Sequence, residues 1–136
     1  VILTEKSLAC SQENITLSCI ADGASLGFMA PSDIYSFFGN ALDNAIEATR
    51  TIEDPERRNI SLNVARRGAM VAVSVENFYA TEPQFDGDLP RSTKGDDANH
   101  GFGVRSMRST VERYGGTLHV GTNDGVFYLN ALLPAK

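Results

Sequence analysis

Apolar and polar positions follow two different periods along this chain. Strict alternation, which indicates half-buried strands, predicts strands at residues 14–20, 59–67, 70–77, 117–121 and 126–133. Apolar residues at helical spacing predict two main helices, at residues 33–49 and 103–114, and more weakly the end of a helix within residues 1–12. This order of elements predicts an α/β fold with a mixed, mostly antiparallel sheet and helices packed on one face.

The two main helices have recognisable ends. Pro31 is followed by Ser32 and Asp33, either of which can cap the free amides of the first helix. Gly115-Gly116 is a typical stop for the second helix, since glycine readily leaves the helical conformation. We therefore expect the first helix to begin near Asp33.

The segment from 78 to 99 is polar and is interrupted by prolines and glycines. Segments of about 20 residues without regular structure are uncommon in compact domains and usually have a function. We expect residues 79–99 to form a long loop or lid. Because the segment offers few apolar side chains as anchors, we also expect it to be the most mobile part of the chain.

Length and charge narrow the class of protein. The 136 residues suit a single domain spanning 1–136. A formal net charge of −5 disfavours binding to nucleic acid, and an anionic nucleotide would need local donors and a metal ion to offset repulsion. No apolar run approaches the roughly 20 residues of a membrane span, so we expect no membrane contact by this domain. The start at Val1 rather than Met suggests a fragment.

The two cysteines, Cys10 and Cys19, show no metal-ligand spacing. We expect reduced thiols, with a structural disulfide as the alternative.

The first main helix carries a polar stripe without basic residues. At about 100° per residue, its amides and carboxylates gather on one side, at Asn40, Asp43, Asn44 and Glu47. Such oxygen atoms are the ligands that Mg²⁺ prefers, usually together with phosphate oxygens and water. The stripe therefore indicates a possible Mg²⁺ site at Asn40 and Asn44, and a solvated helix face is the alternative.

A glycine-rich segment stands just before the second main helix. It reads His100-Gly101-Phe102-Gly103-Val104. Glycine at a helix N-terminus lets backbone amides approach phosphate closely, and Lys94 upstream offers a cation. The segment matches neither a dinucleotide fingerprint nor a phosphate-binding loop ending in Gly-Lys-Ser/Thr, so a plain turn is the alternative.

Taken together, these segments resemble the GHKL (Bergerat-fold) ATPase superfamily, which includes gyrase, histidine kinases and the MutL repair proteins. Residues 38–48, FGNALDNAIEA, look like its N-box, and residues 99–104, NHGFGV, look like its second glycine box. The helix end at 114–118 and the strand at 125–134 resemble its closing pattern. The resemblance spans roughly residues 14–134 and is greatest to the AgrC-like peptide-quorum-sensor branch of bacterial sensor histidine kinases.

The resemblance implies a two-layer α/β sandwich that binds ATP and Mg²⁺ between the long helix, the lid and the second helix. Asn44 matches the family's metal-binding asparagine, with Asn40 as a helper, and Asn77 falls where the family's adenine-reading aspartate is expected. The phosphate-binding residues implied by the match are Lys94, His100, Gly101, Phe102, Gly103 and Val104. Related hydrolases have a glutamate in place of Asn40 to activate water. An amide cannot act as a general base, which favours a kinase.

Two features bear on activity. The family's first glycine box, which contains the adenine-reading aspartate, has no match here beyond Asn77. This departure allows a second hypothesis, a degenerate domain that binds nucleotide or protein without kinase activity. Neither His100 nor His119 lies in a sequence typical of a phosphoacceptor helix. The resemblance therefore implies a catalytic ATP-binding domain, without a certain catalytic residue of its own, that phosphorylates a histidine on a separate dimerisation domain. A response regulator would be a further partner, and the location would be the cytoplasmic side of a membrane-anchored bacterial sensor kinase.

Overall fold

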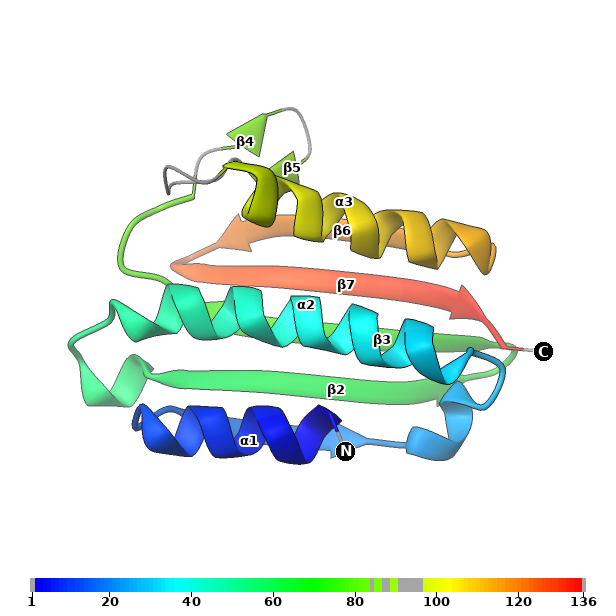
Figure 1. Cartoon of the computed structure of the whole chain (residues 1–136), viewed down its shortest axis with the longest axis horizontal. Helices are drawn as coiled ribbons and strands as arrows, with labels where there is room; N and C mark the ends of the chain where they lie inside the picture. Colours follow the sequence, from blue (N-terminus) through cyan, green and yellow to red (C-terminus); the bar gives the residue numbers. More distant parts are fainter. Residues whose placement is uncertain (1, 84, 87–88, 91–96, 136) are drawn as a thin grey trace.

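The computed structural model describes residues 2–83, 85–86, 89–90 and 97–135, of which 86, 89, 90 and 97–102 are described by their backbone alone. Figure 1 shows the elements. The helices are α1 (Ile2–Gln12), α2 (Pro31–Arg50) and α3 (Asp97–Arg113), with short 3₁₀ turns η1 (Gly23–Leu26) and η2 (Pro55–Arg57). The strands are β1 (Thr16–Ala21), β2 (Asn59–Arg67), β3 (Met70–Phe78), β4 (Phe85–Asp86), β5 (Leu89–Pro90), β6 (Thr117–Asn123) and β7 (Val126–Pro134).

Five of these strands form one mixed sheet in the order β1-β2-β3-β7-β6. β1 pairs with β2 in parallel, and the other neighbours are antiparallel. The five predicted strands are therefore confirmed, as is the mixed, mostly antiparallel sheet. A second, two-stranded sheet joins β4 to β5, inside the segment that was expected to be a structureless lid.

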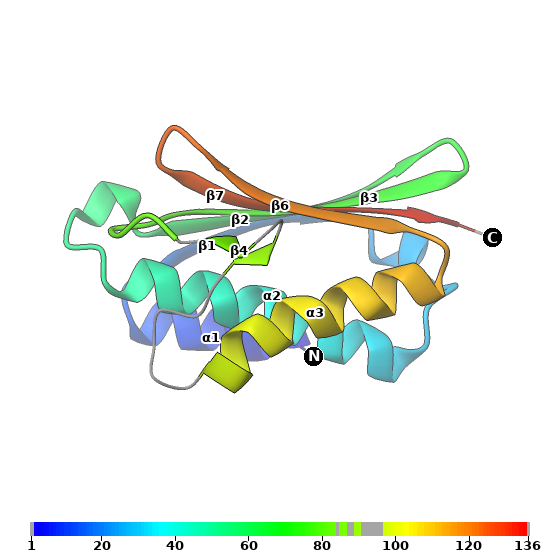
Figure 2. The same cartoon turned by 90° about the horizontal axis from the view of Figure 1, so that it is seen from above.

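The helices cover one face of the large sheet, as Figure 2 shows, so the fold is the predicted two-layer sandwich. Alternate strand residues face the helices and are buried, whereas the residues between them lie on an open face. Apart from Asn77, these buried strand residues are apolar, and the core includes Ile60, Leu62, Val64, Val71, Val73, Val75, Leu129, Ala131 and Leu133. α2 contributes most of the helical side of the core, through Phe37, Phe38, Ala41, Leu42, Ala45 and Ile46.

The expected cap of α2 is wrong. The helix begins at Pro31, and its N-cap residue Ala30 makes no side-chain capping bond. Neither Ser32 nor Asp33 lies at the N-cap position. Instead, the backbone amide of Ala30 donates to the Tyr114 hydroxyl at 2.9 Å, so a side chain from the end of α3 partners this end of α2.

The expected start of α3 is also wrong. The helix begins at Asp97 rather than Gly103, so the glycine-rich segment lies within the helix and not in a turn before it. Its end is as predicted: Gly115 has φ 82°, in the left-handed region that favours glycine. A side chain at Gly116 would collide with the carbonyl oxygen of Leu132, so this glycine permits α3 to turn tightly into β6.

Candidate functional site

α2 lies between α1 and α3 and presents a different chemistry to each (Figure 1). On the α1 flank, polar side chains of α2 are paired. Lys6 Nζ lies 2.6 Å from Asp43 Oδ1, and Arg50 Nε lies 2.6 Å from Glu13 Oε1. Asp43 therefore points toward α1 and lies at the α1 side of the polar stripe that it shares with Asn40 and Asn44.

The opposite flank of α2 contacts the end of α3 through Asp33. The Tyr114 hydroxyl donates to Asp33 Oδ2 at 2.6 Å, and Arg113 Nη2 donates to Oδ1 at 3.1 Å. The hydrogen bond from Tyr114, as the larger cause, and the one from Arg113 lower the pKa of the Asp33 carboxyl below its ordinary value. Because Tyr114 also holds the Ala30 amide, this contact fixes the two helices where they meet.

Asn40 and Asn44 lie on the same flank as Asp33. At about 100° per residue, all three fall within an arc of about 40°, and Asp43 and Arg50 lie about 60–80° away from Asn40, on the side toward α1. Both asparagines are half-buried. Within the described residues, neither side-chain amide has a hydrogen-bond partner, in contrast to the paired groups on the α1 flank. Glu47, one turn further along, does have an interaction.

The glycine-rich segment lies level with these asparagines. α2 and α3 run in opposite directions and are joined at the Asp33–Tyr114 contact. Asn44 and Gly103 are equally far along the chain from that contact, about 16 Å at 1.5 Å per residue. A Cβ built on Gly103 would meet nothing within 4 Å, so the backbone is open to approach there.

The other residues predicted to contact phosphate lie in α3 or upstream of it. Val104 is 1% exposed and packs in the hydrophobic core, so only its backbone can face a ligand. His100, Gly101 and Phe102 belong to α3, with only their backbone described. Lys94 lies outside the described residues, as does much of the expected lid.

Asn77 is buried at the end of β3. It is 3% exposed, and its strand neighbours are Ile60 on β2 and Phe127 on β7. Its Nδ2 donates to the carbonyl of Phe78 at 2.8 Å, which orients the side chain and leaves Oδ1 as an acceptor without a donor among the described residues. An acceptor held in this way suits a ligand that offers an amino group.

Two residues near this end of the sheet were missed by the sequence analysis. Phe85 on β4 stacks on Phe127 with ring centroids 6.5 Å apart, so the expectation that the lid segment lacks apolar anchors is wrong. Phe85 was a detectable signal, as an aromatic residue in a polar stretch. Thr49 was not detectable: it is fully buried on the last turn of α2, and its hydroxyl has no partner among the described residues.

The donor set of this flank fits a hard cation beside a phosphate. The described part of the chain contains no group of three or more His, Cys, Asp or Glu that could hold a metal ion by itself. Asn40 and Asn44 instead offer neutral oxygen atoms without competing partners, and Mg²⁺ commonly takes one or two protein oxygens and completes its shell with phosphate and water. A neutral donor also adds no repulsion against a triphosphate.

Neither titratable thiol belongs to this flank. Cys10 is buried and Cys19 exposed, and both are free, so the expected reduced thiols are confirmed. Across the described residues, no helix is long and apolar enough to cross a membrane.

Comparison with known proteins gives a consistent picture. The family model described as "GHKL domain" matches residues 29–134. The catalytic domain of histidine kinase ThkA, in a nucleotide-free form, superposes with a TM-score of 0.69 at 19% identity, covering 98% of this chain and 90% of that one. A further nucleotide-free form gives 0.70 at 16% identity, with 98% and 92% covered.

A second kinase is similar in the same way. Acinetobacter baumannii histidine kinase AdeS gives a TM-score of 0.66 at 11% identity, covering 99% of this chain and 64% of that one. No curated protein sequence matches this chain. At these identities the solved structures establish the fold, and the family model establishes membership. The chain belongs to the GHKL domain family.

Proposed function

We propose that this chain is the ATP-binding catalytic domain of a sensor histidine kinase. It binds Mg-ATP between α2, α3 and the segment 79–99, and donates the γ-phosphate to a histidine on a separate dimerisation domain. The observation that carries the proposal is the pair Asn40 and Asn44. Their amides are half-buried and have no partner within the part of the chain that the structure describes, on the flank of α2 that faces α3, while the flank toward α1 carries ion pairs.

In this proposal, the chain's own residues bind and orient the nucleotide. Asn44, with Asn40 one turn earlier, holds the cation through side-chain oxygens. A bound Mg²⁺ would neutralise charge on the phosphates and fix their geometry. Backbone amides around Gly101 and Gly103 and the cation of Lys94 would contact the phosphates, as would His100, Phe102 and the backbone of Val104.

The adenine end of the nucleotide is assigned to Asn77. Its Oδ1 accepts from the exocyclic amino group, because Nδ2 is already engaged with the Phe78 carbonyl. An amide oxygen accepts a weaker hydrogen bond than a carboxylate does, so we expect lower nucleotide affinity than a family aspartate would give.

Transfer to an acceptor, rather than hydrolysis, follows from the side chains present. Asn40 cannot take a proton from water, so the flank lacks the general base of the related hydrolases. His119, on β6, faces the open side of the sheet opposite Asn130, away from the helices. The acceptor histidine must then come from another domain, and catalysis consists of positioning and charge neutralisation.

The same assignment gives the chain its cellular setting. We place it in a two-component system, on the cytoplasmic side of a membrane-anchored bacterial sensor kinase of the AgrC-like branch. Its partners would be the dimerisation domain of that kinase and a response regulator.

A second candidate function is motivated by Asn77. Where the family's first glycine box has an aspartate and glycines, this chain has an asparagine followed by Phe78 and Tyr79. A domain that had lost catalysis would keep the fold and act as a nucleotide-sensing or protein-interaction module.

Phosphotransfer in trans separates the two candidates. The chain is incubated with γ-labelled ATP, Mg²⁺ and an isolated dimerisation domain of an AgrC-like kinase. Acid-labile label on that domain, absent without this chain and reduced with the Asn44→Ala variant, supports the kinase. Nucleotide binding without transfer would support the second candidate, and label on this chain alone would contradict both.

A further inference from the structure

β1 forms a free edge of the large sheet. In the parallel ladder with β2, the amide of Thr16 donates to the Arg58 carbonyl at 2.9 Å, and that of Asp22 donates to Val64 at 3.0 Å. Backbone groups alternate in direction along a strand. The N–H and C=O groups of Leu17, Cys19 and Ala21 therefore point away from β2, toward the outside of the sheet.

The two edges of the sheet differ in whether side chains contact their outer backbone groups. On β6, Arg108 Nη2 donates to the Leu118 carbonyl at 3.4 Å. β1 reads Thr-Leu-Ser-Cys-Ile-Ala, without the charges or prolines that usually discourage strand addition at an edge. Among the described residues, no side chain donates to or accepts from its outer backbone groups.

Among the described residues, the outer face of α1 beside this edge carries no charge, and Asp22 lies just beyond the end of β1. Glu5 and Lys6 of α1, and Glu13 just after its end, turn toward α2, where they pair with Tyr35, Asp43 and Arg50. The outer flank of α1 is left with hydroxyl and apolar side chains. Leu8 is 60% exposed there, and Ile20 on β1 is 75% exposed.

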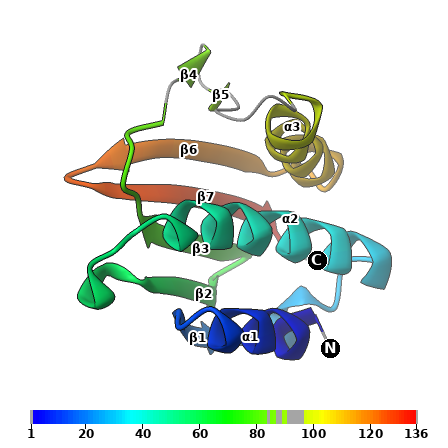
Figure 3. The ribbon, with the colours of Figure 1, turned by 60° about the vertical axis from the view of Figure 1, so that its left-hand side comes forward.

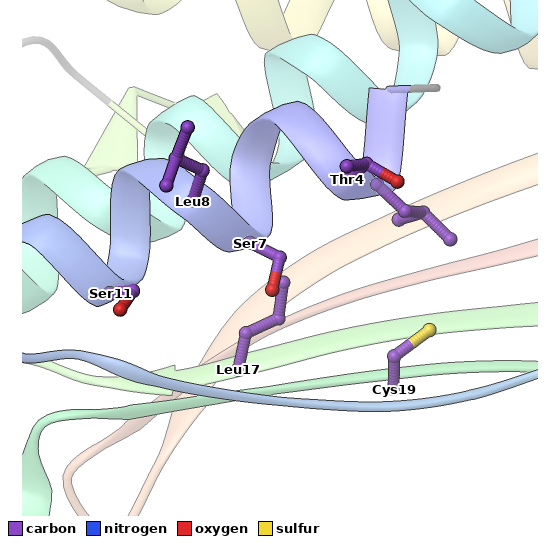
Figure 4. Close-up of a pocket in the computed structure, with 7 residues that line it drawn as sticks. Thr4, Ser7, Leu8, Ser11, Leu17 and Cys19 are labelled. Atoms are coloured by element: carbon purple, nitrogen blue, oxygen red, sulfur yellow. The ribbon is translucent and has the colours of Figure 1, made fainter.

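A groove of about 500 Å³ runs between α1 and β1 along this edge. Figure 4 shows its walls, formed on one side by Thr4, Ser7, Leu8 and Ser11 and on the other by Leu17 and Cys19. It lies on the helix-covered side of the sheet. Alternate side chains of any strand added beside β1 would point to that side, and so toward the groove.

We propose that the β1 edge binds an extended, uncharged segment of a partner protein, which adds a sixth strand to the sheet. The outer groups of Leu17, Cys19 and Ala21 supply the backbone hydrogen bonds, as in other cases of strand addition. The groove receives small apolar side chains at alternate positions of the segment. Its uncharged walls select against Lys, Arg, Asp and Glu at those positions, since a buried charge there would have no partner.

The geometry disfavours a second copy of this chain as the occupant. α1 packs against β1 on the helix face (Figure 3). Joining two β1 edges would set the strands about 4.8 Å apart and would bring the two α1 helices toward each other on the same face. Packed helices need about 8–10 Å. A single added strand carries no helix and meets no such conflict.

A peptide titration followed by NMR tests this proposal. The probe is a capped peptide of six alternating Val and Thr residues with a polar tail, and the matched control has Lys in place of each Val. At the weak affinity expected of so small an interface, with a Kd of about 0.1–1 mM, the first peptide should shift the amide signals of Leu17, Cys19 and Ala21 and slow their hydrogen exchange. The Lys peptide should do neither.

Two variants locate the site. Cys19→Pro removes one outward N–H and spares the ladder with β2, and should weaken binding about tenfold or more. Ser7→Arg fills the groove from the exposed face of α1 and should do the same while melting like the parent. Ile20→Thr, on the open face of the same strand, should bind like the parent.

Three outcomes would overturn the proposal. The first is no binding of the Val/Thr peptide at about 1 mM. The second is equal binding by Ser7→Arg, which would place the peptide elsewhere. The third is dimerisation of the chain in analytical ultracentrifugation that Cys19→Pro abolishes, because the edge would then pair with itself.

Discussion

The two flanks of α2 differ in a way that its amino-acid pattern alone does not reveal. Toward α1, the helix offers charges, and each meets a partner: Asp43 with Lys6 and Arg50 with Glu13. Toward α3, Asp33 is paired at the beginning of the flank, whereas the amides of Asn40 and Asn44 have no partner among the described residues. Polar groups on a half-buried surface are normally paired. The amides of Asn40 and Asn44, which have no partner among the described residues, are therefore candidates for binding a ligand.

The two flanks of α2 should also differ in whether they contribute to stability or to ligand binding. The α1 flank holds α1 and α2 together through ion pairs, whereas the Asn40 and Asn44 side chains have no hydrogen bond in the described residues to lose. Substitutions on the first should therefore change unfolding, and substitutions on the second should change ligand binding.

The largest effect is expected at Asn44. In the proposed site, Asn44→Ala would remove one oxygen ligand of the cation, and the loss of a charge-assisted contact typically costs about 1.5–3 kcal/mol, or roughly 10- to 150-fold in Mg-ATP affinity. The fold should survive, because alanine is the better helix former. Calorimetric titration and thermal unfolding check both statements. Asp43→Ala, the neighbouring residue on the paired flank, is the control and should leave affinity unchanged.

Asn44→Asp sharpens the same point. It keeps an oxygen atom but adds a charge beside the phosphates, so its Mg-ATP affinity should depend on Mg²⁺ concentration more steeply than that of the parent. A titration at several Mg²⁺ concentrations measures this. If the dependence matched the parent's, Asn44 would not face the cation.

A smaller effect is expected where α3 meets α2. Tyr114→Phe removes both the acceptor of the Ala30 amide and the donor to Asp33 Oδ2, and a lost hydrogen bond typically costs about 0.5–1.5 kcal/mol of unfolding free energy, or more where the partner is charged. Urea unfolding monitors the change. Because the two helices are fixed at this point, ATP affinity should also fall slightly. An unchanged unfolding midpoint would show that the contact does not hold the helices.

Acidic pH should weaken the carboxylate contacts on both flanks of α2 and so lower the stability of the fold. The pKa of Asp33 is lowered by Tyr114 and then Arg113, and that of Glu13 is lowered mainly by its hydrogen bond to Arg50. A carboxyl group stabilises the folded state when its pKa is lower in that state than in the unfolded chain. The contribution is complete above the pKa of the unfolded chain and is lost as the pH falls through the pKa of the folded state. Stability should therefore decline below about pH 4. Asp33→Asn should reduce the decline, and Asp33→Asn with Glu13→Gln should reduce it further, as thermal unfolding between neutral and acid pH can measure.

The smallest effect is expected on the paired flank. Lys6→Met removes the partner of Asp43, whose side chain is 56% exposed. Exposed ion pairs contribute at most about 1 kcal/mol, and less at high salt. The variant should melt slightly earlier at low salt and bind Mg-ATP like the parent. A loss of ATP affinity here would remove the distinction between the flanks.

Local pattern was enough to predict most of the fold. Alternation marks one buried face on β2, β3 and β7, and the apolar stripe of α2 marks the side that meets the sheet. The start of α3 could not be predicted, because Gly101 and Gly103 cost about 1 kcal/mol each in a helix and read as a turn. Val104 and Met107, both 1% exposed, pack the helix onto the core, and tertiary packing can override local propensity.

The residue types of the candidate site could be predicted, but which polar side chains pair with one another could not. Helical spacing puts Asp43 near Asn44, and only the position of α1 shows that Asp43 turns away to Lys6. The N-terminus of α2 was misjudged for the same reason: Tyr114 comes from a segment far along the chain, and no local rule anticipates a long-range partner. Contacts between distant segments decide which polar residues remain open.

The central claim is that the open flank of α2 binds Mg-ATP, and isothermal titration of ATP into the chain tests it most directly. The account predicts binding within about 1 mM in the presence of Mg²⁺, marked weakening when a chelator removes the cation, and a similar loss in Asn44→Ala but not in Asp43→Ala. Binding of ATP that is indifferent both to the chelator and to Asn44→Ala would contradict it, and so would the absence of any binding.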